Sequence, residues 1–373
     1  MIADEGRMNA YSSALQHAIR PNSIVLDIGA GTGILSLLAC QFGARKVYAV
    51  EPNSAIGLAE ETARANGFAD RIEFIQALST EICLPEKADV IVSDLRGVLP
   101  LLKLHLPSII DARRRLLAPG GNLIPKRDVL WAAIVETPTY YDRLRKPWLR
   151  ERFDLNMEAA FQAVTNVLSN QAGVTPDQLL SEPHRWATID YFTVESSDVS
   201  AEMTFQITRP GTAHGLLVWF DAVLDEGIKF SNAPGQPQLI YGSGFFPWSY
   251  PVRLTLEDMV SVNLRADLVG SDYVWSWETA VHGRHTGSPN VHFRQSTFLG
   301  TPLSPAELRK RGSNYHPSLK PNGEVDLHIL QLMDGTRSNE EIADIVVARF
   351  QSCFQSTRDA LTRITDLVEK YSH

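Results

Sequence analysis

The segment Val25-Leu-Asp-Ile-Gly-Ala-Gly-Thr-Gly33 decides the fold of this 373-residue chain. Its apolar, β-branched start predicts a strand over 23–27, and helical spacing of apolar residues follows over 34–42. The three glycines between them let the backbone turn tightly and let a ligand approach the main chain. The amide groups at the start of the helix favour a polar or anionic ligand group. The segment therefore predicts a strand–loop–helix unit with a ligand site at the carboxyl end of the strand.

An acidic residue closes the next predicted strand. That strand covers 46–50, and Glu51 follows it. A carboxylate at this position can accept hydrogen bonds from both hydroxyls of a ribose. The glycine spacing is G-x-G-x-G, which differs from the dinucleotide spacing because residue 34 is isoleucine. Loop and acid together indicate an adenosine-bearing cofactor, with a plain strand–helix turn as the alternative.

The pattern over 1–125 continues to alternate. Further strands are expected over 71–76, 88–93 and 122–124, with helices over 55–66 and 101–117. Strands that alternate with helices imply a parallel sheet covered by helices on both faces. The expected fold class is α/β, with a Rossmann-like first domain over 1–125.

Strand-like segments separated by turn residues dominate from residue 126 to residue 297. This pattern is typical of an antiparallel sheet or β-barrel. Helical spacing over 154–180 interrupts it and predicts an arm whose apolar face, left in water, would form a large exposed patch. We therefore expect a homodimer formed through this arm. The strand-like segments cover 129–135, 185–192, 202–207, 215–220, 259–264 and 273–279.

The last part of the chain, 298–373, is predicted to be a small helical domain of winged-helix size. Ser338 and Glu341 have the spacing of a capping box at the start of one helix, and Ser356 opens the next.

Composition excludes several classes of protein. With 35 basic and 43 acidic residues, the net charge of −8 provides no basic field for nucleic acid or an anionic membrane. No apolar run is long enough to span a membrane, and the N-terminus lacks the pattern of a signal peptide. Cys40, Cys83 and Cys353 are expected to be buried small residues in a reducing cytoplasm. Three histidines, His282, His285 and His292, do not make a metal site, and none is expected.

Four segments carry a resemblance to a known family. They are Asp4-Glu-Gly-Arg-Met-Asn-Ala-Tyr11, Val25–Gly33, Val47-Tyr-Ala-Val-Glu-Pro52 and Leu116-Leu-Ala-Pro-Gly120. Together they resemble the protein arginine methyltransferases, closely over the first domain and loosely to about residue 280. The resemblance implies a β-barrel domain with a dimerisation arm, and S-adenosylmethionine as cofactor. It assigns the cofactor carboxylate to Arg7, the methionyl end to Asp27 and Gly29, and the ribose to Glu51. The implied cofactor-binding set is Arg7, Asp27, Gly29, Gly31, Gly33, Glu51, Pro52, Ser79 and Thr80.

The resemblance breaks on the acceptor side. The family carries two glutamates that bind a guanidinium, and ungapped alignment puts Asp94 and Lys103 at these positions. Lys103 would repel a guanidinium, and Arg96 nearby is expected to add more positive charge. The family's Thr-His-Trp loop aligns with 245–248, which keeps Trp248 and replaces the histidine by Pro247. Asp94, Lys103 and Arg96 are therefore the candidate catalytic residues.

These residues predict a methyltransferase with a remodelled acceptor site, acting on a nitrogen or oxygen of a peptide or small molecule that carries an acidic or neutral polar group. One alternative is a true arginine methyltransferase that uses Asp94 with acids from elsewhere. The other is a catalytically silent, cofactor-binding partner subunit.

The segment 323–342 resembles the PqqD-like peptide-binding modules. That resemblance implies capture of a leader peptide at a sheet edge. A helical cap that only stabilises the fold is the alternative.

Overall fold

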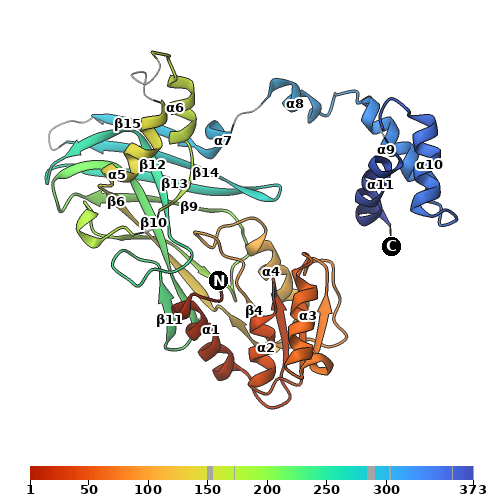
Figure 1. Ribbon diagram of the computed structural model, residues 1–373. Coiled ribbons are helices and arrows are strands. Elements are labelled where there is room, and N and C mark those ends of the chain that lie inside the picture. The colour runs from red at the N-terminus through yellow and green to blue at the C-terminus, as the bar shows by residue number, and fades with distance from the viewer. Residues whose placement is uncertain (149–153, 172, 284–289, 302–303, 355, 373) are drawn as a thin grey trace. The chain divides into compact units, whose positions relative to one another are not determined.

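The first part of the chain forms a five-stranded parallel sheet in the order β3-β2-β1-β4-β5 (Figure 1). The central strand β1 is buried at all five positions, as expected for an apolar strand covered on both faces. The order reverses between β1 and β4, and ligands bind at such switch points. The strands are β1 (Ile24–Ile28), β2 (Lys46–Val50), β3 (Ile72–Ile75), β4 (Ala88–Ser93) and β5 (Leu117–Ile124). The helices are α1 (Glu5–Ala18), α2 (Ile34–Gln41), α3 (Ala55–Ala65) and α4 (His105–Arg115), with a 3-10 turn at Ala69–Arg71.

The computed structural model describes residues 1–148, 154–171, 173–283, 290–301, 304–354 and 356–372. The chain divides into two units, 1–302 and 303–373. The parallel sheet and the following antiparallel part, expected as two domains, lie together in the first unit.

Two antiparallel sheets make up the rest of the first unit. One has the order β7-β12-β10-β6-β8 with β11 paired to β10, and the other has the order β15-β14-β13-β9. The strands of the first are β6 (Arg127–Val135), β7 (Ser169–Gln171), β8 (His184–Asp190), β10 (Gly211–Asp225), β11 (Ile228–Ser231) and β12 (Ser243–Leu254). Those of the second are β9 (Val199–Gln206), β13 (Met259–Val269), β14 (Asp272–His282) and β15 (Val291–Ser296).

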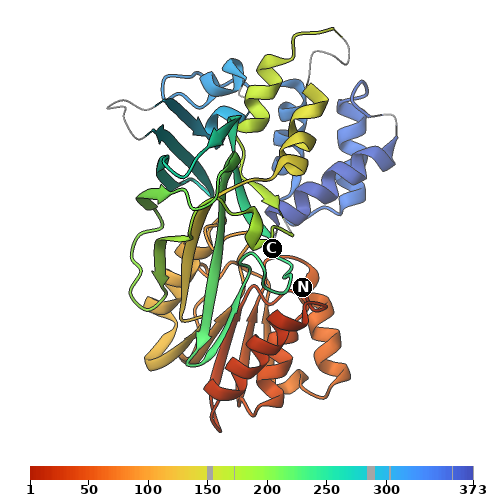
Figure 2. The same cartoon turned by 90° about the vertical axis from the view of Figure 1, so that its left-hand side faces the viewer.

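Aromatic side chains fill the space between these sheets. β14 alternates buried and partly exposed residues, so that Trp275 and Trp277 face inward. Phe246 of β12 lies between them, with ring centroids 5.2 Å and 5.0 Å away. The long strand β10 continues from this core to the first helix, α1 (Figure 2).

The arm region contains less helix than its sequence predicts. Among the described residues of 154–180, only α6 (Glu158–Thr165) is an α-helix, and the others include β7 and a 3-10 turn at Pro176–Gln178. The face of α6 packs in part on its own chain, against α5 (Pro138–Arg145), β12 and α7 (Thr297–Gly300), while a 3-10 turn at Lys146–Trp148 follows α5. The boundary expected between the β-barrel domain and the helical C-terminal domain, at residues 297 and 298, falls inside α7.

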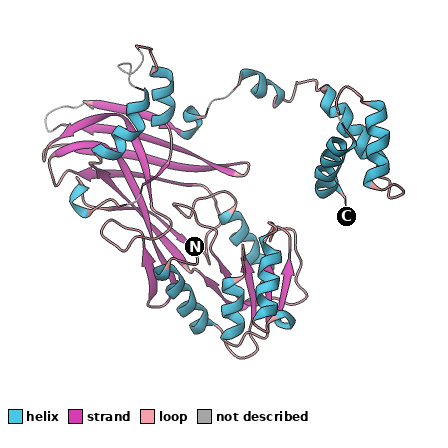
Figure 3. Ribbon diagram, in the orientation of Figure 1, coloured by secondary structure: helices cyan, strands magenta, loops and turns pink. Residues whose placement is uncertain are grey.

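The second unit is helical, with α8 (Pro305–Lys310), α9 (Pro321–Leu332), α10 (Asn339–Arg349) and α11 (Thr357–Tyr371) (Figure 3). Its core includes Ile329, Val346 and Ile364. The capping box is confirmed, because Ser338 Oγ accepts from the Glu341 amide and the Glu341 carboxylate accepts from the Ser338 amide. The described residues of this unit contain no strand, so the sheet edge implied for peptide capture is absent from them.

We expect Ile364→Ala to lower the unfolding free energy of the second unit by about 2–5 kcal/mol, because it opens a cavity in a small core. Ile345→Ala removes a side chain that is 39% exposed and serves as the control. All seven tryptophans precede residue 302, so tryptophan fluorescence reports the first unit alone. Both units contain helices, so a loss of helical circular dichroism without a fluorescence change reports unfolding of the second unit. A parallel shift of both signals would contradict independent unfolding of the two units.

Candidate active site

A cavity of about 460 Å³ opens at the carboxyl ends of the parallel strands, where the strand order reverses. The loops after β1, β2, β3 and β4 line it. Gly29, Pro52 and Ser79 of the predicted cofactor set lie in its wall, and Thr80 is exposed outside that lining. The roles of these residues toward a cofactor stay predictions.

The glycine loop requires glycine for two different reasons. All three glycines have positive φ, at 74° for Gly29, 54° for Gly31 and 81° for Gly33. A Cβ at Gly29 would lie 2.4 Å from the Leu95 side chain, and one at Gly33 would lie 2.8 Å from Ala59. A Cβ at Gly31 would meet no atom within 4 Å. Gly31 therefore leaves open space above the loop.

Glu51 holds the loop in place. Its carboxylate accepts hydrogen bonds from the Gly31 amide at 3.1 Å and from the amide and side chain of Asn53 at 3.0 Å and 2.7 Å. The predicted acidic residue and the predicted glycine loop thus form one hydrogen-bonded unit.

Asp27 carries an unpaired oxygen. Ser36 donates to its Oδ2 at 2.7 Å, but buried Oδ1 has no hydrogen-bond partner among the described residues. Burial raises the pKa of Asp27 to about 6, although the Ser36 hydrogen bond works in the opposite direction. A buried carboxylate oxygen without a partner, next to a ligand-binding loop, is a position for a cationic ligand group.

Asp94 is buried and fully engaged. Its carboxylate pairs with the Arg7 guanidinium, accepts from the Tyr241 hydroxyl at 2.6 Å and lies 3.3 Å from Nη1 of Arg96. Only 3% of its side chain is exposed. Asp94 therefore holds Arg7 and Tyr241 in position, and its negative charge is balanced within the protein.

The expectation that Arg96 adds positive charge to the acceptor pocket is wrong. Its guanidinium is fully buried and makes a two-pronged ion pair with Asp128, at 2.9 Å and 3.0 Å. Arg96 also donates to the Tyr11 hydroxyl at 2.6 Å, and the Tyr191 hydroxyl donates to Asp128. Burial alone lowers the pKa of Arg96, but Asp128 raises it well above its usual value. The arginine is therefore always charged and always paired.

Lys103 differs from its two neighbours in the candidate set. It is exposed, has a left-handed backbone with φ of 44°, and lines the cavity together with Asp272. Its amino group can therefore remain in water at the cavity mouth.

The alignment of the Thr-His-Trp loop is wrong. Trp248 and Pro247 belong to β12, and the Trp248 side chain is fully buried against Phe293. The aromatic residue that reaches the site is Tyr241, and the neighbouring Ile240 amide donates to Asp4 at 2.8 Å.

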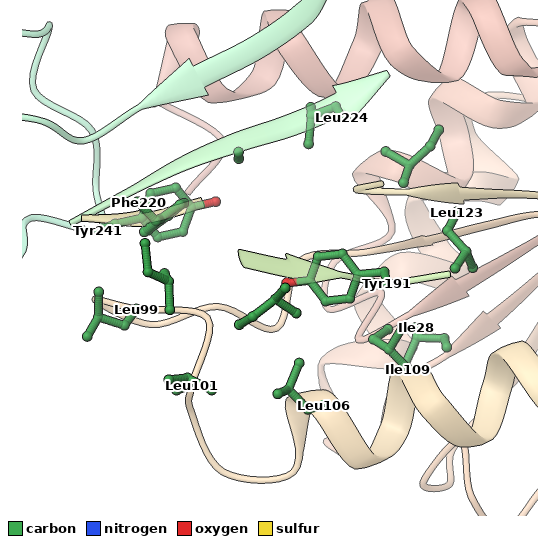
Figure 4. Close-up of a cluster of buried hydrophobic side chains, with 14 of the residues drawn as sticks. Ile28, Leu99, Leu101, Leu106, Ile109, Leu123, Tyr191, Phe220, Leu224 and Tyr241 are labelled. Atoms are coloured by element: carbon green, nitrogen blue, oxygen red, sulfur yellow. The ribbon is translucent and has the colours of Figure 1, made fainter. Parts of the chain in front are cut away.

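Sequence reasoning missed several residues around the site. Tyr191 and Tyr241 lie among buried apolar side chains that join β1 and α4 to β10 (Figure 4). His105 is buried with Nδ1 2.7 Å from the Pro100 carbonyl, and burial lowers its pKa to about 4. The missed residues are Tyr11, Ser36, His105, Asp128, Tyr191, Tyr241 and Asp272. The partners of Asp128, Tyr191 and Tyr241 lie far away in the chain, so no local motif marks these three. Tyr11, by contrast, closes the segment Asp4–Tyr11, and the partners of Ser36 and His105 are close in sequence.

Other expectations concern features outside the cavity. Within the described residues, no group of three or more metal-ligating side chains converges, and no helix is long and apolar enough to cross a membrane. His285 lies outside the described residues. Cys40 is buried as expected, but Cys83 and Cys353 are exposed.

Two family models match consecutive parts of the chain. The first, described as ribosomal protein L11 methyltransferase, matches residues 12–124. The second, described as the arginine methyltransferase oligomerization subdomain, matches residues 126–268.

Curated relatives are protein arginine N-methyltransferases. Protein arginine N-methyltransferase 6 of Danio rerio is 35% identical over 276 residues, covering 70% of this chain and 76% of the relative. Protein arginine N-methyltransferase PRMT10 of Oryza sativa subsp. japonica is 43% identical over 299 residues, covering 70% and 78%. A probable protein arginine N-methyltransferase 6 of Arabidopsis thaliana is 31% identical over 245 residues, covering 64% of this chain but 55% of the relative.

Solved structures share the fold. Arabidopsis thaliana protein arginine methyltransferase 10 superposes with a TM-score of 0.71 at 24% identity, covering 79% of this chain and 95% of that chain. The Trypanosoma brucei PRMT1 enzyme–prozyme heterotetrameric complex with AdoHcy gives 0.71 at 22% identity with the same coverage.

We expect Asp128→Asn to destabilise the first unit by about 3–5 kcal/mol, because it leaves the buried Arg96 charge without its partner. Combining Arg96→Met with Asp128→Leu removes both charges and should recover most of that loss. Denaturant unfolding followed by tryptophan fluorescence measures both effects. Glu86→Gln, which breaks the exposed pair with Arg45, should cost less than about 1 kcal/mol. A double variant as unstable as Asp128→Asn would contradict the role of the pairing.

Proposed function

Because the chain belongs to the protein arginine methyltransferase family and is an S-adenosylmethionine-dependent methyltransferase, we propose that it methylates a guanidino nitrogen of arginine in a peptide. The observation that carries the proposal is the cavity at Gly29, whose lining includes one acidic side chain, Asp272. Glu51, between the lining residues Val50 and Pro52, holds the glycine loop through the Gly31 amide.

Residues of the first unit fit the methyl donor. The unpaired Oδ1 of Asp27 suits the ammonium group of the methionyl part, and Glu51 suits the ribose hydroxyls. Arg7 uses Nε toward Asp94 and Tyr241, while its Nη2 has no hydrogen bond within the described residues, so it can take the donor's carboxylate. When bound, S-adenosylmethionine supplies a methyl group on a positively charged sulfur.

The protein's contribution to catalysis is positioning. The acceptor nitrogen gains the methyl group, the electrons of the broken carbon–sulfur bond stay on sulfur, and the nitrogen releases one proton. Holding the nitrogen in line with that bond in a dry cavity accounts for much of the rate enhancement. The buried network of Arg7, Asp94 and Tyr241 holds the Arg7 guanidinium in a fixed position.

A second candidate is transfer to an acceptor with a neutral or acidic group. The observation that favours it is Lys103 in the cavity lining, combined with an Asp94 whose charge is balanced by Arg7 and Arg96.

We further propose that two copies assemble through the arm over 154–180, which contains α6. The match of residues 126–268 to an oligomerization subdomain supports this proposal. Leu155, at the start of the arm, is 58% exposed and would gain apolar contacts in a dimer.

Affinity for S-adenosylhomocysteine, the product form of the donor, should fall by about tenfold between pH 7 and pH 5. Asp27 has a pKa of about 6, and its protonation removes the negative charge that attracts the ligand's ammonium group. His105, with a pKa of about 4, stays largely neutral over this range. Titration calorimetry of wild type and Asp27→Asn checks the expectation. The variant should bind more weakly at pH 7 and show a flat profile, whereas a flat wild-type profile would contradict the role of Asp27.

Radiolabelled methyl transfer to arginine peptides tests the proposed function, with mass spectrometry to locate the methyl group. We expect methylarginine from the wild type and no product from matching citrulline peptides. Lys103→Glu should lower KM by about tenfold, because it replaces repulsion of a guanidinium by attraction.

Two other outcomes would overturn the proposal. Transfer only to neutral or acidic acceptors would establish the second candidate. Cofactor binding without transfer to any acceptor would indicate a silent partner subunit.

A further inference from the structure

A second cavity adjoins the first. Its volume is about 300 Å³, and it shares two lining residues, Leu102 and Asp272, with the cavity beside Gly29. A molecule in the second cavity that reaches Leu102 and Asp272 therefore lies next to a ligand bound in the first cavity. The remaining lining comes from the loop before α4, the segment that directly follows α6, β14 and α7.

Asp272 stands at the tip of the β13–β14 hairpin. It pairs with Val269 across a turn in which Gly270 has φ of 67°. Its Oδ1 accepts from the Tyr273 amide at 2.8 Å, which fixes the side chain at the start of β14. The hairpin tip, Ser271 and Asp272, lines the first cavity together with Lys103. Figure 1 shows the hairpin extending above the loop that leads into α4.

The second cavity has the chemistry of a cation site. Among the described residues that line it, Asp272 is the only charged one. The others include Leu99, Leu101 and the buried ring of Trp275. Tyr273 is neutral, because burial raises the pKa of its hydroxyl. One carboxylate beside an aromatic wall favours a cation over a neutral or anionic group.

No other described carboxylate lines either cavity. Asp94 is buried and balanced by Arg7 and Arg96, so a guanidinium would have to displace an existing ion pair to reach it. Lys103 and Asp272 are both exposed, but Lys103 lines only the first cavity, whereas Asp272 lines both.

We propose that Asp272 binds the guanidinium of the acceptor arginine, with the side chain entering through the second cavity. This proposal rests on the function proposed above. It places the negative charge that attracts the guanidinium on the β13–β14 hairpin, whereas the residue aligned with the family's second glutamate, Lys103, is positively charged. Asp272 is then a residue that determines specificity for a cationic acceptor.

The test measures binding of a charged peptide and its neutral analogue to the full-length chain saturated with S-adenosylhomocysteine. The probes are acetyl-Gly-Gly-Arg-Gly-Gly-amide and the same peptide with citrulline in place of arginine. Calorimetry should show wild type binding the arginine peptide about tenfold more tightly than the citrulline peptide. Asp272→Asn should reduce the ratio of the two affinities, arginine peptide over citrulline peptide, to about one. Asp272→Glu should restore part of this ratio.

The matched control is Asp267→Asn. This residue lies on the same hairpin, pairs with Arg265 and lines neither cavity, so its loss should leave the ratio unchanged. Lys103→Met should raise the ratio, because it removes the opposing charge at the mouth. Unchanged S-adenosylhomocysteine affinity in each variant verifies that the protein is folded.

The proposal is overturned if the wild type does not discriminate between the two peptides, or if Asp272→Asn discriminates as well as wild type. Methyl transfer measured on the same samples separates this result from the proposed function. Discrimination without transfer would refute arginine methylation and leave the binding role of Asp272 standing. Transfer with an unchanged KM in Asp272→Asn would refute the role of Asp272 alone.

Discussion

The buried ion pair between Arg96 and Asp128 joins the two halves of the first unit. Arg96 follows the parallel strand β4, and Asp128 belongs to β6, the first strand of the antiparallel part. Two buried charges carry a large desolvation penalty, which is offset here by two-pronged geometry and by the hydroxyls of Tyr11 and Tyr191. Since Tyr11 lies on α1, the same cluster also fixes the helix that carries Arg7. The cavity at the switch point therefore has walls from both halves held at a defined separation.

Local sequence patterns predict most of the parallel-sheet part of the first unit, where the cofactor site is expected. The strands at 46–50 and 88–93 were predicted with the bounds that β2 and β4 have, and the glycine loop meets Glu51 as expected. These features depend on neighbours in sequence or on the regular alternation of strands and helices. The first residue of a helix is harder to predict where apolar residues continue into the preceding loop. The helix expected over 101–117 begins at His105, because the apolar residues before it belong to the cavity-lining loop.

The surroundings of the candidate acceptor residues depend on contacts between segments that lie far apart in the sequence, which no local pattern reveals. Tyr241 reaches Asp94 across 147 residues of sequence, and alignment placed Trp248 there instead. Arg96 looked available because its partner, Asp128, opens a different sheet. Strand β12 was missed altogether: its first six residues are buried on both faces and include glycine and proline, so neither alternation nor composition marks it. In each case the structural role is decided by tertiary packing, which cannot be read from a single sequence.

The unpaired oxygen of Asp27 has a consequence for the lifetime of the protein. Near neutral pH the ligand-free chain keeps a buried negative charge that only Ser36 partly satisfies. A ligand that brings a cationic group to this oxygen favours the folded state over the unfolded one, by an amount that grows with ligand concentration. With the methyl donor bound at Asp27 as proposed, a larger supply of donor would lower the fraction of the first unit that opens to proteases, which would tie the abundance of the protein to the metabolite it consumes.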